Sequence, residues 1–360
     1  MKKIACMLSL AGTIATPMAA WAQSSVTVYG IMDLAARYVA NDGVGSVTSL
    51  ISGGNATSRL GLRGSEDLGG GLSARFQLEH GISADTGTPA GGNTFWDRLA
   101  WVSLASNSLG ELRLGRDYVP TYTNWVRFDP FSNVGVAGVG NMLPASQVGP
   151  IRSAFASNPN TLVRSNNAVQ YLLPANLGGI EGGLMVAAGE GGTAANGQHK
   201  LLGLRLGYAT GAWVVSGAYD ETKNELTGNE SFKDGIIAGS YDFGVVKLNA
   251  AWRRFDFLDS KQTNILLAAI LPVGAAGQLK VSYQKADLSG RVRTTNVADN
   301  DGAQLGLGYV HNLSKRTALY ASYSRINNDG VATFVVPGGA SGLTAGGNSW
   351  GVESGVRHIF

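Results

Sequence analysis

Among the residue types that can bind ligands or take part in chemistry, arginine is the one that recurs in a regular pattern in this sequence. Arg59 and Arg63 alternate with Leu60 and Leu62, and similar alternations follow along the chain. A guanidinium is always charged near neutral pH and binds carboxylates and phosphates through several N–H groups. Side chains two residues apart lie on the same face of a β-strand. The pattern therefore predicts strands with arginines on one face and apolar residues on the other.

Residues suited to catalysis or metal binding form no recognisable set. Acid–base or nucleophilic catalysis usually needs a histidine beside a nucleophile or an acid. The four histidines, none in a catalytic motif, are His80, His199, His311 and His358. No pair has metal-ligand spacing, and no phosphate-binding glycine motif follows a strand and opens a helix. We therefore expect no enzyme, no metal and no cofactor.

The alternation recurs in segments of about ten residues, the length of a strand that crosses a membrane at a tilt. In the first segment, Val28, Leu34 and Tyr38 share one face, while Asp33 and Arg37 share the other. Counting the segments predicts sixteen strands, centred near residues 32, 62, 77, 101, 113, 169, 185, 205, 216, 238, 250, 267, 282, 307, 321 and 354. The polar parity is expected to hold Asp33, Arg37, Arg59, Arg63, Arg75, Glu79, Arg98, Arg113, Arg164 and Arg205.

The connections between these segments alternate between short and long. Tight turns are expected at residues 67–71, 106–110, 210–212, 242–244 and 313–316. Long loops, rich in Gly, Asn, Asp and Thr, are expected near residues 41–55, 84–93, 117–163, 222–231, 287–300 and 327–347. Short turns at one end and long loops at the other are typical of bacterial outer-membrane barrels.

The composition favours a sheet that spans a membrane. Charged residues make up only 15% of the chain, while glycine is frequent at 51 and proline scarce at 10. After the N-terminal segment there is no apolar stretch of about 18 residues, so a membrane would be crossed by strands. A sheet in hydrocarbon must pair its first strand with its last. We expect an all-β, antiparallel transmembrane barrel that closes near Phe360, the final residue.

The N-terminus has the pattern of an export signal. Lys2 and Lys3 precede an apolar run, and Ala20 and Ala22 supply the small residues of a cleavage site. We expect residues 1–22 to be cleaved and residues 23–360 to form one barrel domain. Cleavage lowers the basic residues from 28 to 26 against 25 acidic ones, a formal charge of +1, so nucleic acid is not a favoured partner. The single cysteine, Cys6, leaves with the signal.

Five motifs carry a family resemblance over the whole mature length. They are residues 25–30 (SVTVYG), 58–72 (SRLGLRGSEDLGGGL), 114–116 (LGR), 313–324 (LSKRTALYASYS) and 355–360 (GVRHIF). With them the chain resembles the trimeric general diffusion porins of Gram-negative bacteria, especially the type found in Neisseria and Burkholderia. The resemblance implies a homotrimer in the outer membrane that passes small hydrophilic solutes and ions. It also implies contact with outer-membrane lipids and lipopolysaccharide, and insertion by the barrel-assembly machinery.

The resemblance further implies that the third long loop, from about Asp117 to Asn160, folds into the barrel and narrows it. Basic residues on the wall would then face acidic residues on the loop. By position in the motifs, the constriction would consist of Arg59, Arg98, Arg164, Asp117 and Asp129. All three arginines fall on the expected inner parity. Because the loop has few acids, we expect a weak preference for anions.

Other interpretations remain open at this stage. The arginines could be solvated wall charges held by carboxylates such as Asp33 or Glu79, without a role in selectivity. A porin specific for one anion or small metabolite could use the same barrel, although the inner parity shows the arginines without a matching ladder of aromatic residues along the lumen. An outer-membrane barrel enzyme and a secreted soluble β protein or adhesin are the remaining classes.

Overall fold

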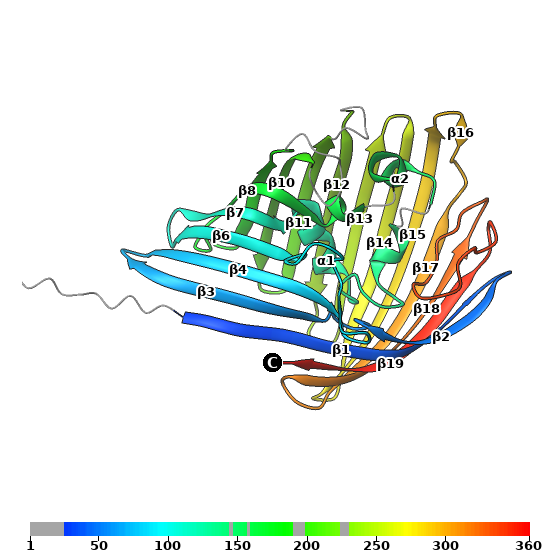
Figure 1. Ribbon diagram of the computed structural model, residues 1–360, viewed down its shortest axis with the longest axis horizontal. Coiled ribbons are helices and arrows are strands. Elements are labelled where there is room, and N and C mark those ends of the chain that lie inside the picture. Colours follow the sequence, from blue (N-terminus) through cyan, green and yellow to red (C-terminus); the bar gives the residue numbers. More distant parts are fainter. Residues whose placement is uncertain (1–24, 144–146, 157–158, 190–198, 224–229) are drawn as a thin grey trace, which may run out of the picture.

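Sixteen strands of the described residues join into one antiparallel barrel. The structure, a computed structural model, describes residues 25–143, 147–156, 159–189, 199–223 and 230–360 (Figure 1). The barrel strands are β1 (Ser25–Asn41), β3 (Arg59–Gly69), β4 (Leu72–Ser83), β6 (Leu99–Ser106), β7 (Gly110–Tyr118), β8 (Arg164–Leu172), β9 (Ile180–Ala187), β10 (Lys200–Thr210), β11 (Trp213–Lys223), β12 (Phe232–Asp242), β13 (Lys247–Phe257), β14 (Ser260–Val273), β15 (Gly277–Val292), β17 (Gly302–Asn312), β18 (Thr317–Asn328) and β19 (Ser349–Ile359). Each of the sixteen predicted segments coincides with one of these strands, which confirms the predicted fold class.

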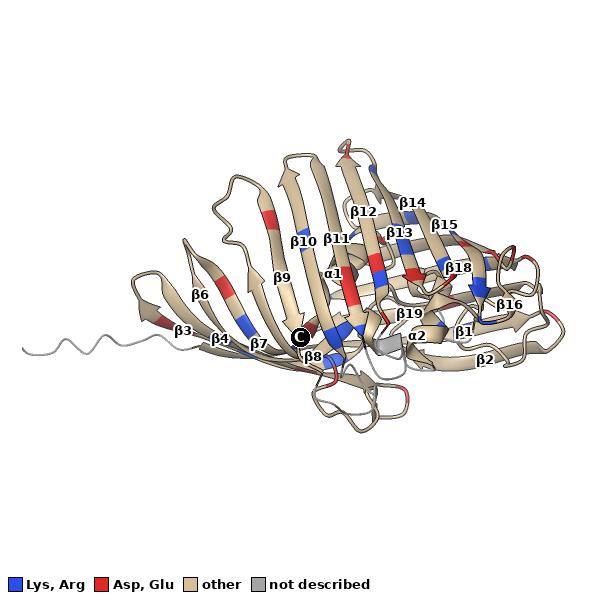
Figure 2. Ribbon diagram, turned by 90° about the horizontal axis from the view of Figure 1, so that it is seen from above, with Lys and Arg blue, Asp and Glu red and all other residues tan. Residues whose placement is uncertain are grey.

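The alternation of side chains separates an outer from an inner face. On β10, Leu202, Leu204 and Leu206 are each about half exposed, whereas Leu201 is 3% exposed. The exposed apolar parity is the one that meets hydrocarbon in a membrane barrel. Charged residues are sparse along the strands (Figure 2). No helix among the described residues is long and apolar enough to cross a membrane.

The barrel closes where the first strand meets the last. β1 pairs with β19 from Ile31 opposite Ile359 to Asn41 opposite Ser349, and the two strands lie side by side in Figure 1. Beyond this ladder, Gly30 and Phe360 exchange two backbone hydrogen bonds, each 3.1 Å from N to O. The predicted closure at Phe360 is therefore present in the structure.

Three short strands lie in connections that the sequence suggested were loops. They are β2 (Gly45–Ser52), β5 (Thr88–Pro89) and β16 (Thr295–Asn296). β1 is 17 residues long, and only its first part, Ser25–Ile31, pairs with β3. The rest of that edge needs another partner, and β2 supplies it from Leu34 to Asn41. The prediction of a loop over residues 41–55 was therefore wrong for Gly45–Ser52, which form strand β2.

The two ends of the barrel differ in their connections, as expected. Strands β10 and β11 are joined by residues 211–212, and β17 and β18 by residues 313–316. At the other end, residues 119–163 and 329–348 form the longest described connections. One connection at this end departs from the alternation, because residues 258–259 alone join β13 to β14. The expected leader, residues 1–22, lies outside the described residues.

The described residues of the connection 119–163 fold against the inner face of the wall. They form α1 (Pro120–Phe128), η1 (Val139–Met142), α2 (Pro150–Phe155) and η2 (Pro159–Leu162). Trp125 and Phe128 of α1 are buried in a cluster with inner residues of β11 to β14, among them Ala218, Ile236 and Leu266. The wall residues in this cluster are alanines and larger apolar side chains, and the small alanines leave room for the helix.

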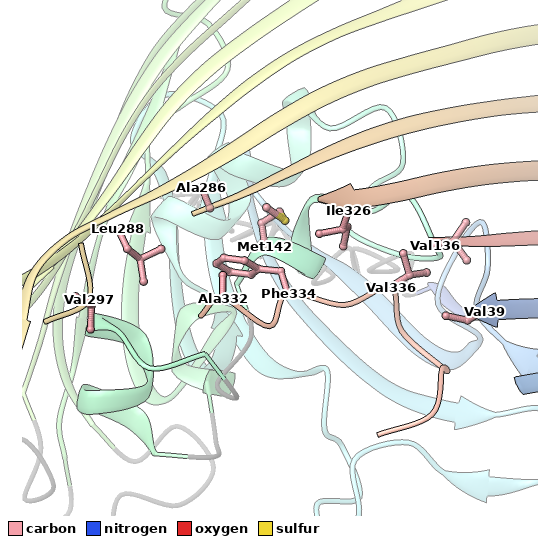
Figure 3. Packing of buried hydrophobic residues seen from close by; sticks show 10 residues of the cluster. All are labelled: Val39, Val136, Met142, Ala286, Leu288, Val297, Ile326, Ala332, Phe334 and Val336. Atoms are coloured by element: carbon pink, nitrogen blue, oxygen red, sulfur yellow. The ribbon is translucent and has the colours of Figure 1, made fainter. Parts of the chain in front are cut away.

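The connection 329–348 also contributes to the interior. Phe334 and Val336 are fully buried in a cluster with Met142 and Val136 of the segment 119–163 (Figure 3). Asn328 on β18 fixes this connection, because its side-chain amide donates to the Phe334 carbonyl at 2.9 Å and its Oδ1 accepts from the Phe334 N–H at 3.0 Å. Two connections thus pack on each other inside one side of the barrel.

The closure predicts a specific weakness at Gly30. A Cβ at this position would overlap the Phe360 ring and the Arg59 carbonyl. Gly30→Ala should therefore lower stability by about 1–3 kcal/mol, the usual cost of overpacking. Gly235→Ala on β12 is the matched control, since the nearest atom to a Cβ there is 3.7 Å away. The temperature at which the folded band converts to the unfolded band on a gel measures the effect, and equal shifts in both variants would contradict it.

Candidate functional site: a basic cavity inside the barrel

A buried polar cluster attaches α1 to the barrel wall. Thr121 donates its backbone N–H to Asp220 at 3.0 Å and its hydroxyl group lies 2.5 Å from the same Oδ2 and 2.8 Å from Asp234 Oδ2. Arg253 binds Asp234 through Nε at 2.9 Å and Nη2 at 2.6 Å. All four side chains are nearly inaccessible to solvent. Because a buried charge without partners is costly, this cluster favours one position of the helix.

A second attachment holds the far end of the inward segment. Glu353 on β19 accepts hydrogen bonds from Arg37 Nε at 2.9 Å and from the Val136 N–H at 3.0 Å. Arg37 also donates to the carbonyl of Pro337 in the connection 329–348, at 3.2 Å. The pair of Arg37, a predicted inner residue, and Glu353 therefore links the wall to both inward connections.

Glu79 on β4 holds two of the predicted wall arginines. Its Oε1 accepts a hydrogen bond from Arg98 Nε at 2.6 Å, and its Oε2 lies 3.3 Å from Arg59 Nε. Tyr29 donates its hydroxyl group to the same carboxylate at 3.0 Å. One carboxylate thus serves two guanidinium groups, so a positive charge remains.

The position of the Arg98 side chain does not follow from the alternation of side chains along the strand. Strict alternation in β6 places Arg98 on the parity of Val102 and Leu104, which is the exposed outer face. The assignment of Arg98 to the inner strand parity was therefore wrong. Arg98 precedes the first residue of β6, where the pleat does not fix the side chain, and its guanidinium reaches Glu79.

Arg164, the third predicted arginine, packs on an aromatic pair. Its Cζ lies 4.7 Å from the centre of the Tyr118 ring, and Tyr118 stacks on Tyr122 with the ring centres 5.2 Å apart. The Tyr118 hydroxyl accepts hydrogen bonds from Arg98 at 2.8 Å and from Arg164 at 3.3 Å. The three predicted arginines therefore gather around Glu79 and Tyr118.

Asp33 positions the neighbouring backbone rather than an arginine. Its carboxylate accepts N–H hydrogen bonds from Gly54, Asn55 and Ala56, the shortest at 2.7 Å, and a hydroxyl hydrogen bond from Tyr320. The segment ahead of β3 is fixed in this way.

Two further cations of the inner wall, on β15 and β19, were not predicted. Lys280 lies on β15, with Nζ 5.8 Å from the centre of the Phe131 ring, and Arg357 lies on β19 and donates to Asn55 Oδ1 at 2.9 Å. Both lie on inner parities, and Arg357 is in the C-terminal motif. Their parity in the sequence indicates that both side chains face the lumen. Their depth in the barrel depends on the register between strands, which the sequence does not give.

A cavity of about 320 Å³ lies between the barrel wall and the inward segment. Its lining residues are Asn55, Ala56, Thr57, Arg59, Arg98, Tyr118, Tyr122, Thr123, Val126, Ser132, Val134, Lys280 and Arg357. Among these described residues four are cations and none is a carboxylate. A solute in this cavity meets positive charge from two sides.

The two predicted loop acids do not line this cavity. Asp129 is 4% exposed and accepts backbone hydrogen bonds from Phe131, Asn133 and Val139. Burial raises the pKa of the Asp129 carboxyl, and these three hydrogen bonds oppose the rise. Asp117 ends β7 and binds Arg113 at 3.0 Å. Each carboxylate holds local structure, and the charge of Asp129 also interacts with that of Lys280.

The remaining predicted wall arginines lie on the inner face, and three of them form ion pairs near the end with short turns. Arg113 contacts Glu111 at 2.8 Å, and Arg75 lies 3.6 Å from the same carboxylate. Arg205 binds Glu181 at 2.7 Å. Arg63 forms no ion pair among the described residues and lies over Tyr29. The inner wall is thus mostly paired here.

Aromatic rings of the inner wall lie beside three of the inner arginines. Three guanidinium groups lie over inward-facing rings, with Cζ to ring-centre distances of 5.2, 4.3 and 4.7 Å for Arg63 over Tyr29, Arg113 over Trp101 and Arg164 over Tyr118. Parity alone indicated that Tyr29 and Trp101 face inward. The pairing itself depends on neighbouring strands and their register.

A closed sixteen-strand barrel with an apolar outer face and a basic inner cavity defines a channel protein of the bacterial outer membrane. A family model described as Gram-negative porin matches residues 8–331. The chain is 37% identical to outer membrane porin protein 32 of Delftia acidovorans, over 96% of this chain and 97% of that protein. It is 31% identical to an outer membrane porin protein of Bordetella pertussis, over 86% of this chain and 91% of that protein.

The solved structures give the same result. The anion-selective porin from Comamonas acidovorans matches with a TM-score of 0.80 at 35% identity, covering 94% of this chain and all of that one. The chain belongs to the Gram-negative porin family. It lies in the outer membrane, where its barrel forms a channel for passive diffusion of small hydrophilic solutes and ions.

The attachment of α1 predicts a defined effect of Thr121. Thr121→Ala removes the hydroxyl group that contacts both Asp220 and Asp234, and should lower stability by about 1–3 kcal/mol because buried acceptors lose a donor. Thr121→Ser keeps the hydroxyl group and is the control. We expect more current noise in single channels and a lower unfolding temperature for Thr121→Ala alone. Two variants that both behave like the unmodified protein would contradict the attachment.

Proposed function

We propose that the basic cavity is the constriction of the channel and that it gives the pore a preference for anions. The observation that carries this proposal is the lining itself: Arg59, Arg98, Lys280 and Arg357 bound the cavity without a carboxylate among its described lining residues. Cations arranged in a narrow site with low-dielectric walls concentrate anions and exclude cations.

Lys280 and Arg357 are the cations that contribute most to this field. Arg59 and Arg98 share Glu79, which offsets part of their charge. Lys280 and Arg357 form no salt bridge with a described residue. Their polar and ring contacts are with Asn55 and Phe131, and the Asp129 carboxylate interacts with Lys280 only at longer range. Arg164 supports the wall behind Tyr118. In this proposal Asp117 and Asp129 hold the backbone of the constriction, and Asp129 also offsets part of the charge of Lys280.

The remaining expectations about partners form part of the same proposal. We infer a homotrimer, and an apolar groove of about 630 Å³ on the outer wall, with Ala36 and Ala321 between larger side chains, supports contact between copies. Another sector of the outer face carries a row of charges across three strands, in which Asp256 lies between Lys233 and Lys261. Charges there suit the level of lipid and lipopolysaccharide headgroups.

Export and insertion complete the proposal. Residues 1–22 act as a cleaved signal, and the terminal Phe360 is presented to the barrel-assembly machinery. The channel acts without catalysis or a cofactor, as the porin family and fold favour.

The proposal predicts how neutral substitutions change ion preference. Lys280→Gln and Arg357→Gln should each lower the chloride-to-potassium permeability ratio by about 2- to 5-fold, because a unit charge a few Å from an ion contributes about 1 kcal/mol at a water-like dielectric. Arg325→Gln is the matched control, since Arg325 is exposed on the outer face and bonds to Asn327.

Reversal potentials in a potassium chloride gradient across planar bilayers measure the ratio. A cation preference in the unmodified channel would contradict the proposed function. So would equal shifts in Arg325→Gln and in the two cavity variants.

A further inference from the structure

The constriction cavity has an apolar and aromatic side in addition to its basic side. Val126 of α1, Val134 and the half-buried Tyr122 line it together with the cations. Tyr122 stacks on Tyr118 and is thereby held in place. Selection by charge alone would not require apolar surface in the proposed constriction, because water solvates inorganic ions better than apolar side chains do.

The guanidinium groups of this lumen already accept aromatic rings. Arg63, Arg113 and Arg164 each lie over a ring of the inner wall. A second cavity of about 180 Å³, lined by Arg113 and Arg205, adjoins the first and shares Tyr118 and Thr123 with it. A flat ring therefore finds guanidinium or aromatic surface both in the constriction and next to it.

We propose that the constriction preferentially binds carboxylates that carry a flat aromatic ring. The carboxylate lies toward Lys280, Arg59 and Arg357, and the ring contacts Tyr122 and the two valines. The volume of about 320 Å³ is at the lower end of the range of about 300–1,000 Å³ that holds small organic ligands. The proposal rests on the proposed function, because it names the anions that the basic cavity favours.

Three carboxylates separate the contribution of the ring from that of charge and size. Benzoate is the aromatic probe, cyclohexanecarboxylate has the same charge and a similar size without aromaticity, and acetate has the charge alone. Each is added to channels that carry chloride current in planar bilayers, and the concentration that halves the current is measured. We expect benzoate to act at a concentration about 3- to 10-fold lower than cyclohexanecarboxylate, with acetate the weakest.

Two substitutions at one position test the assigned ring contact. Tyr122→Leu keeps an apolar side chain and should bring benzoate and cyclohexanecarboxylate within a factor of about 2 of each other, because the aromatic contact is lost. Tyr122→Phe keeps the ring and should retain the difference. Neither substitution changes a charge, so the ratio of the benzoate to the cyclohexanecarboxylate concentration within each variant reports the ring contact.

The outcomes separate this inference from the proposed function. If the unmodified channel prefers chloride over potassium but does not distinguish benzoate from cyclohexanecarboxylate, the ring site is overturned and the anion channel stands. A difference that persists fully in Tyr122→Leu overturns the assigned site. Loss of any preference for chloride over potassium in the unmodified channel overturns the proposed function itself.

Discussion

Every barrel strand needs a hydrogen-bonded neighbour on both sides, because hydrocarbon offers backbone N–H and C=O groups no other partner. The pairing of β1 with β19 satisfies this requirement for the two ends of the sheet, and the exchange between Gly30 and Phe360 extends it to the last residue. Closure also produces the interior. Once the sheet is closed, the polar parity of all sixteen strands faces one enclosed space, and the arginines gather there.

The shape of that space depends on buried polar contacts rather than on the strands alone. Thr121 binds two carboxylates of the wall, and Glu353 joins the wall to Val136. Between these attachments, apolar side chains such as Trp125 fill the side of the barrel over β11 to β14. The remaining passage runs past the basic residues of the opposite wall. The place where the inward segment is held therefore determines where the proposed constriction lies and which charged residues line it.

The strands could be predicted from the sequence because alternation is a local property, with lipid on one face and a polar lumen on the other. Contacts that depend on register could not. Lys280 and Arg357 meet in one cavity only because β15, β19 and the inward segment converge there. Arg98 precedes its strand, so parity did not describe it. Asp129 looked like a pore acid, but its carboxylate caps three backbone N–H groups of its own loop.

The positive field inside the constriction is the central claim, and its most direct test uses a single introduced thiol. The chain has one cysteine, Cys6, in the expected signal, so Thr57→Cys would place a unique thiol on the cavity lining. Its modification rate is measured through the fall in single-channel current, with an anionic and a cationic thiosulfonate reagent of similar size. We predict faster modification by the anionic reagent, with the difference reduced at high salt. Equal rates, or faster modification by the cationic reagent, would contradict the claim.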